Sequence, residues 1–208
     1  MKRKGYLIEK IADMDNLRAA DREAQSGKVK KNRFIRRHNE HAEEDLMKLR
    51  QMILTLDFPP ANFTTIQFVS DAGKKRNIAK QRYFPWRILH HAIMRVIDPD
   101  FNKMFIYDTS ACIKGRGLHY GVKRMQMFLR RYPEYKWFVK TDYKKFYESI
   151  PHDVILSSLR HKYKDEHFIR LIEVAILSYE SGNDTFKALD DEKKKRGSNR
   201  LLYQSAAG

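Results

Sequence analysis

Apolar residues recur at helical spacing through most of the 208 residues, and this periodicity constrains the fold more than any other feature. In the segment 34–56, Leu46, Leu49, Ile53 and Leu56 fall three or four residues apart, so they share one face of a helix. Similar patterns predict further helices over 8–24, 84–97, 118–131 and 166–180, with another opening at Pro151. The sequence therefore predicts a chain rich in helix.

Two segments depart from this pattern because they are rich in β-branched and aromatic residues. Residues 63–69 predict a strand, turn residues follow at 70–73, and residues 76–80 return as the second strand of a hairpin. Residues 136–142 form a second apolar run, which predicts a buried strand ending at an acidic residue. Helices combined with these strands predict an α+β fold.

Positive charge is concentrated in the middle of the sequence. The chain has 42 Lys and Arg against 26 Asp and Glu, a net charge of +16, and residues 74–131 hold 14 of the basic side chains but only 3 of the acidic ones. Such charge attracts polyanions, nucleic acid first. Aromatic residues interleave with the basic ones there, which suits a groove that binds phosphates and stacks bases. The alternative is a solvated basic face over an ordinary aromatic core.

Composition also excludes several classes of protein. The single cysteine, Cys112, rules out an internal disulfide framework and a zinc site built on several thiolates, and we expect it to be a small buried residue. Adjacent His90 and His91 point about 100° apart on a helix, so they are expected in the core or on a helix face rather than around one metal ion. No apolar run approaches ~18 residues and no signal peptide is recognisable, so we expect a soluble, cytoplasmic protein without a membrane partner.

The segment 138–153 carries the strongest indication of chemistry. Asp142 follows the predicted strand directly, where a carboxylate and the next backbone carbonyl can provide hard oxygen ligands for a divalent cation. Tyr147 lies five residues further on, where its ring can form a wall of the same pocket. Without a metal, an aspartate in this position serves as a helix cap or a turn residue, and both readings remain open.

Three segments of the chain together resemble the reverse transcriptase family, in the order in which that family carries them. Residues 138–153 are similar to its motif A. The run Lys74-Lys-Arg76-Asn-Ile-Ala, followed by residues 86–101, resembles its first fingers motif, and Ala111-Cys-Ile-Lys114-Gly-Arg116-Gly-Leu-His119 resembles its second. The resemblance covers roughly residues 63–180 and is nearest to the bacterial enzymes of group II introns, retrons and diversity-generating retroelements.

This resemblance implies the fingers and the first part of the palm of a right-hand polymerase, which copies an RNA template from a DNA primer with dNTPs and two Mg²⁺ ions. Asp142 would be the first metal-binding, catalytic aspartate. Tyr147 would pack against the nucleotide sugar, and Arg76, with Lys74 nearby, would hold the triphosphate. Lys114 and Arg116 would close the nucleotide pocket or grip the template backbone.

The resemblance also predicts how the chain is divided and what it lacks. A helical extension (1–60) precedes the fingers (61–135), a partial palm with motif A (136–180) and a charged, divergent tail (181–208). The family's second acidic motif, an aromatic-x-Asp-Asp hairpin, is not found, because Asp190 and Asp191 follow no aromatic residue and lie in a charged run.

We therefore expect a truncated member of the family that is inactive alone. Two alternatives stay open: a non-catalytic RNA-binding fingers domain or remnant, and a helical interaction protein whose charge is incidental. The sequence does not determine the oligomeric state.

Overall fold

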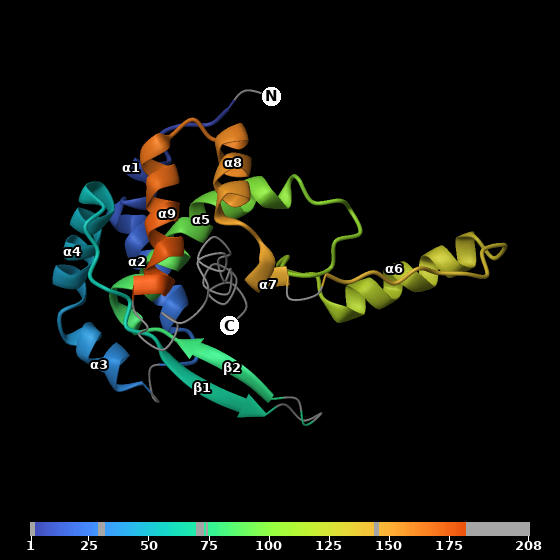
Figure 1. The fold of residues 1–208 in the computed structure, drawn as a ribbon, viewed down its shortest axis with the longest axis horizontal. Helices are drawn as coiled ribbons and strands as arrows, with labels where there is room; N and C mark the ends of the chain where they lie inside the picture. The colour runs from blue at the N-terminus through green and yellow to red at the C-terminus, as the bar shows by residue number, and fades with distance from the viewer. Residues whose placement is uncertain (1–2, 29–31, 70–72, 74, 144–145, 182–208) are drawn as a thin grey trace.

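A helical body, a β-hairpin and a long arm make up the computed structural model, which describes residues 3–28, 32–69, 73, 75–143 and 146–181 (Figure 1). The helices of the body are α1 (Leu7–Ile11), α2 (Met14–Gln25), α3 (Arg33–Glu40), α4 (Ala42–Thr55), α5 (Ile88–Asn102), α8 (His152–Lys162) and α9 (Glu166–Ser181). The arm carries α6 (Leu118–Arg131), and α7 (Phe146–Ser149) follows it. The prediction of a helix-rich chain is confirmed.

The predicted hairpin is present as two antiparallel strands, β1 (Thr64–Val69) and β2 (Lys75–Lys80). Thr64 pairs with Lys80 at the base of the hairpin, and Val69 pairs with Lys75 near its tip. These strands form the only sheet among the described residues. Thr64, Thr65, Ile66 and Val69 of the first strand are β-branched, and such residues favour this extended pairing.

Two predicted helices are each interrupted. The helix expected over 8–24 is α1 followed by α2, because the Asp13 carboxylate accepts hydrogen bonds from the backbone N–H groups of Asp15 and Asn16, at 3.0 and 3.1 Å, and starts a new helix. The helix expected over 34–56 is α3 followed by α4, which meet at His41. Three acidic residues in the first turn of α4 favour a helix N-terminus there, since they complement its dipole.

The helix predicted over 84–97 begins and ends differently. A π-helical turn over Tyr83–Arg87 leads into α5, which continues through Pro99 to Asn102. Proline has no backbone N–H, so α5 lacks the hydrogen bond that a residue at this position would donate to the carbonyl four residues earlier.

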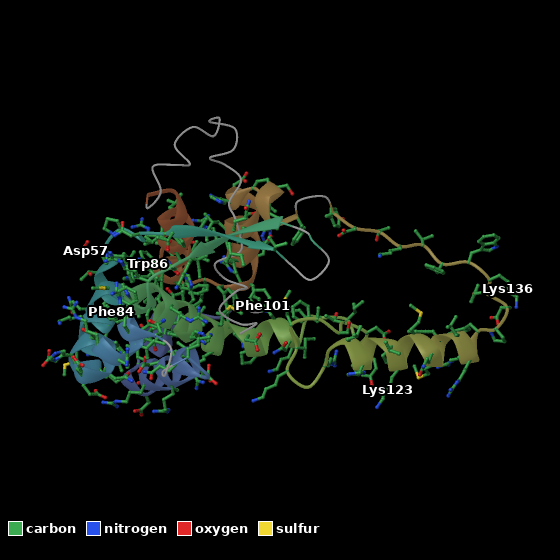
Figure 2. All side chains as sticks on the ribbon, turned by 90° about the horizontal axis from the view of Figure 1, so that it is seen from below. Asp57, Phe84, Trp86, Phe101, Lys123 and Lys136 are labelled. Carbon is green, nitrogen blue, oxygen red and sulfur yellow. The ribbon has the colours of Figure 1, made fainter. Side chains whose placement is uncertain are left out.

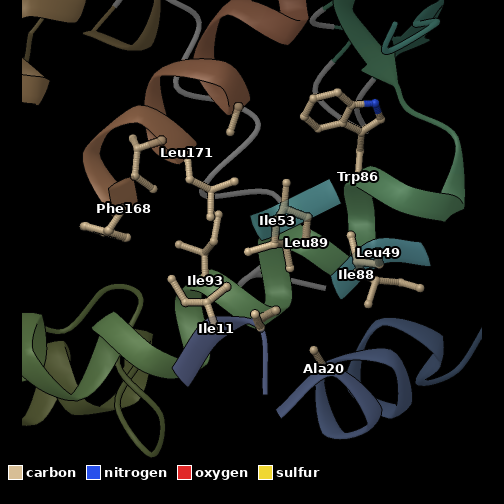
Figure 3. Close-up of a cluster of buried hydrophobic side chains, with 14 of the residues drawn as sticks. Ile11, Ala20, Leu49, Ile53, Trp86, Ile88, Leu89, Ile93, Phe168 and Leu171 are labelled. Atoms are coloured by element: carbon tan, nitrogen blue, oxygen red, sulfur yellow. The ribbon is translucent and has the colours of Figure 1, made fainter. Parts of the chain in front are cut away.

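One hydrophobic core joins helices from both ends of the described chain. α5 lies at its centre, between α1 and α2 on one side and α9 on the other (Figures 1 and 3). Figure 3 shows side chains of this cluster, which come from α1, α2, α4, α5, α9 and the π-helical turn: Ile11, Ala20, Leu49, Ile53, Trp86, Ile88, Leu89, Ile93, Phe168 and Leu171. Burial of such side chains supplies most of the free energy that holds the body together.

Asp165 fastens the two ends of the helical body to each other. Its Oδ2 accepts hydrogen bonds from the backbone N–H groups of Leu7, at 2.7 Å, and Ile8, at 3.1 Å. Its Oδ1 accepts one from the N–H of Phe168, at 3.0 Å. One carboxylate therefore caps both α1 and α9, which lie near opposite ends of the described chain but are adjacent in the fold.

None of the helices in the described ranges combines the length and the apolar character that crossing a membrane requires.

Candidate functional site

Asp142, the predicted metal ligand, lies in an exposed segment rather than at the end of a buried strand. Residues 136–143 have no regular secondary structure, and the side chains of Trp137, Phe138 and Val139 are 94%, 87% and 88% exposed. The prediction of a buried strand is therefore wrong for the described chain. A strand is held by hydrogen bonds to a neighbour, and no strand among the described residues pairs with this segment.

The exposed segment belongs to an arm that projects from the helical body. Figure 2 shows Lys123 on α6 and Lys136 beyond it, both far from Trp86 in the body. No residue of α6 is buried, although the helix is apolar on one side. Its exposed apolar residues include Leu118 and Leu129. The arm is therefore held by polar contacts rather than by a core.

Arg116 supplies several of these contacts. Its Nη1 donates to the backbone carbonyls of Tyr107, at 2.8 Å, and Thr109, at 3.0 Å, and its guanidinium lies over the ring of Tyr120. An ion pair between Arg124 and Asp108 further fastens α6 to the preceding loop.

The side chain of Arg116 thus folds the loop between α5 and α6 onto α6 itself. Lys114 is exposed on the same loop. Their contacts with template or nucleotide stay predictions.

Three predicted nucleotide-binding residues are placed only in part. Arg76 lies in β2, where its backbone faces Phe68 across the hairpin, and Tyr147 lies in α7. The side chains of both are outside the part of the structure that is described, and Lys74 lies outside the described residues altogether. The acidic pair Asp190 and Asp191 also falls outside them.

The described residues do not assemble a magnesium site. No three His, Cys, Asp or Glu side chains gather among them in a metal-binding group. A two-ion site for phosphoryl transfer requires several carboxylate oxygens around the two cations, and Asp142 alone does not fit that requirement.

The predictions for the two adjacent histidines and for the cysteine have different outcomes. His90 and His91 are buried in α5, as expected for core histidines, and burial lowers the pKa of His90 to about 3, so its ring is neutral. Cys112, in contrast, is exposed, so the prediction of a buried thiol is wrong. The reason is that Cys112 lies in the loop between α5 and α6, which contributes no side chain to the core.

A buried polar network around His38 was not predicted from the sequence. The ring of His38, only 3% exposed, lies between two carboxylates: its Nδ1 is 2.8 Å from Asp45 Oδ2 and its Nε2 is 3.2 Å from Asp21 Oδ1. The hydroxyl of Tyr83 and the amide of Gln25 also donate to Asp21. The network joins α2, α3, α4 and the π-helical turn that leads from the hairpin into α5.

Opposing effects set the protonation of this network. Burial disfavours the charged form of His38, but the hydrogen bonds to Asp21 and Asp45 outweigh it, so the pKa of His38 is raised. Burial likewise opposes ionisation of Asp21, yet the hydrogen bonds from His38 and Tyr83 lower its pKa. His38 and Asp21 therefore favour the charged pair, an imidazolium next to a carboxylate. The sequence indicates this network only through Asp21, which is a charged residue on the apolar face of α2.

No family model matches the sequence, and no curated protein matches it. The resemblance to reverse transcriptases therefore rests on the three motifs.

Proposed function

We propose that this chain carries the fingers and the first part of the palm of an RNA-directed DNA polymerase. The observation that carries the proposal is the order of three motifs, at residues 74–101, 111–119 and 138–153. In this proposal Asp142 provides one magnesium ligand, and the remaining ligands come from outside the described residues. The substrates are an RNA template, a DNA primer and dNTPs.

The β-hairpin supports this proposal. The first fingers motif requires a basic residue on a hairpin that can close over a triphosphate, and Arg76 lies in β2 of the antiparallel β1–β2 pair. A two-stranded ribbon projecting from a helical body can present backbone and basic side chains to phosphates at close range. Arg76 is therefore our candidate for the triphosphate contact.

The exposed apolar segment before Asp142 gives a second line of support. Paired as a strand, this segment would point successive side chains to opposite faces, so Trp137, Phe138 and Val139, which are exposed here, would present apolar groups on both faces. This pattern suits the central strand of a sheet that is covered on both faces. Palm strands supplied by another polypeptide segment would bury these side chains and fix Asp142.

Primer extension tests the catalytic part of the proposal. The purified 208-residue protein is incubated with an RNA template, an annealed DNA primer, four dNTPs and Mg²⁺. We expect no extension, because these 208 residues contain no aromatic-x-Asp-Asp segment and one carboxylate binds Mg²⁺ weakly. Synthesis that disappears in Asp142→Asn would refute this expectation and show that the chain is catalytically sufficient.

The coding sequence tests the family assignment directly. In the reverse transcriptase family a Gly-rich segment ending in Ser-Gln lies between motif A and the aromatic-x-Asp-Asp motif. If translation of the DNA downstream of codon 196 in all three frames reveals these two segments in order, the polymerase assignment is supported. If no frame contains them, the second candidate function, a non-catalytic RNA-binding protein, is favoured. The basic excess of residues 74–131 supports that candidate equally well.

A further inference from the structure

A hollow of about 400 Å³ opens between the start of α3 and the end of β2. It is lined by Gly27, Lys28, Asn32, Arg33, Phe34 and Lys80. Figure 1 shows α3 beside the end of the hairpin at which β2 leads back into the helical body. Gly27 has a φ of +69°, in the left-handed region, and turns the chain out of α2 at this point.

Three cations surround this hollow without compensating carboxylates. Lys28, Arg33 and Lys80 line it, and within the described part of the chain none of the three forms an ion pair. Burial, together with the nearby guanidinium of Arg87, lowers the pKa of Lys28. Positive groups that are gathered in one hollow and left unpaired create a local potential that attracts an anion.

Phe34 places an aromatic ring at the edge of the same hollow. The ring is 45% exposed, and the guanidinium carbon of Arg33 lies 5.0 Å from its centroid. The side chain of Asn32 accepts a hydrogen bond from the backbone N–H of Phe34, at 2.9 Å, and so fixes the first turn of α3. A planar group held on a fixed helix turn next to cations is the arrangement on which unpaired bases stack.

We propose that this hollow binds single-stranded nucleic acid, with a phosphate among Lys28, Arg33 and Lys80 and the neighbouring base stacked on Phe34. A single strand is favoured over a duplex because only an unpaired base can present its face to the ring. The inference goes beyond the proposed function, since the site does not use Asp142 and, of its lining residues, only Lys80 lies within one of the three segments that suggest a polymerase.

The position of Lys80 connects the hollow with the hairpin. Lys80 ends β2, four residues after Arg76, which corresponds to about 13 Å at ~3.3 Å per residue. A strand of nucleic acid held in the hollow can therefore continue along β2 toward its tip.

Fluorescence anisotropy with a labelled uridine oligonucleotide of about 12 nucleotides tests the phosphate contacts. Affinity is measured from roughly 50 to 300 mM KCl for the wild type and for the triple variant Lys28→Glu, Arg33→Glu, Lys80→Glu. We expect the variant to bind at least about tenfold more weakly at low salt, and the slope of log affinity against log salt to fall by about 2, since each lost contact removes about 0.7 for single strands.

The matched control carries the same change of net charge elsewhere. Lys10, Arg50 and Arg170 are exposed residues of α1, α4 and α9, and Figure 1 shows α1 and α3 at opposite ends of the helical body. Their replacement by Glu is expected to alter the slope much less. If the control variant loses as much affinity and slope as the hollow variant, general charge attraction explains the binding and the proposal is overturned. Milder Gln replacements repeat the comparison if a Glu variant fails to fold by circular dichroism.

Phe34 provides an independent test that does not depend on charge. We expect Phe34→Ala to weaken binding about fivefold or more at every salt concentration without changing the slope, and Phe34→Trp to restore it. Unchanged affinity of Phe34→Ala, or equal binding of a double-stranded oligonucleotide, would overturn the stacked, single-stranded arrangement. Replacement of Asp142 by Ala should leave these affinities unchanged, which separates this inference from the polymerase proposal.

Discussion

Replacing Asp165 with Ala offers a direct test of how the helical body is held together. The substitution removes three hydrogen bonds, to the N–H groups of Leu7, Ile8 and Phe168, and so uncaps α1 and α9 at once. Loss of a side-chain cap costs about 0.5–2 kcal/mol per helix. Two helix ends therefore predict a loss of about 2–3 kcal/mol of unfolding free energy, or roughly 4–12 °C in Tm for a chain of this size.

The measurement is urea and thermal unfolding, followed by circular dichroism at neutral pH. Asp13→Ala is the matched control, because the Asp13 carboxylate accepts two hydrogen bonds but caps only α2. Its expected cost is about 1 kcal/mol. Asp165→Asn keeps an acceptor oxygen and should fall between the wild type and Asp165→Ala. If Asp165→Ala destabilises the protein no more than Asp13→Ala does, the reasoning that one carboxylate secures both helices is refuted.

Three further outcomes are expected. Because the pKa of His38 is raised in the folded protein, protonated His38 stabilises the fold fully below its unfolded pKa of about 6.5, and this stabilisation is lost as pH rises through the folded pKa. The unfolding free energy measured in urea should therefore be lower at pH 9 than at pH 6, and His38→Gln should remove this difference. Acrylamide should strongly quench the fluorescence of Trp137, measured in the Trp86→Phe variant, and only weakly that of Trp86, measured in the Trp137→Phe variant. Equal quenching of the two would contradict the exposure of the segment that contains Trp137. Arg124→Ala should speed hydrogen exchange in residues 106–117 while leaving the unfolding free energy within about 0.5 kcal/mol, so a large global loss would contradict a coreless arm.

The apolar pattern predicted where helices lie but not where they are interrupted. Residues on both sides of Asp13 and of His41 face the same core, so the periodicity continues across each break. The interruptions come from local hydrogen bonds and charges at helix ends, which contribute little to a pattern of apolar residues. The hairpin was predictable because its two strands and their turn are adjacent in the sequence, and local turn residues bring them together.

Features that depend on distant partners were not predictable in the same way. Residues 136–142 have the composition of a strand, but a strand exists only with a neighbour to accept its hydrogen bonds. The His38 network unites Asp21, Asp45 and Tyr83, whose separations along the sequence follow no repeat. The motif residues have a different status, since their roles come from a resemblance in sequence and not from side-chain geometry.

Because no residue of α6 is buried, sequence change in the arm is largely uncoupled from the stability of the helical body. A substitution in a packed core lowers a folding free energy that is already small, so few are tolerated, whereas a substitution in the arm changes that free energy little. The arm can therefore diverge, lengthen or change its charge under selection for what it contacts alone. Among related chains, variation concentrated in α6 would record a change of partner rather than a decay of the fold.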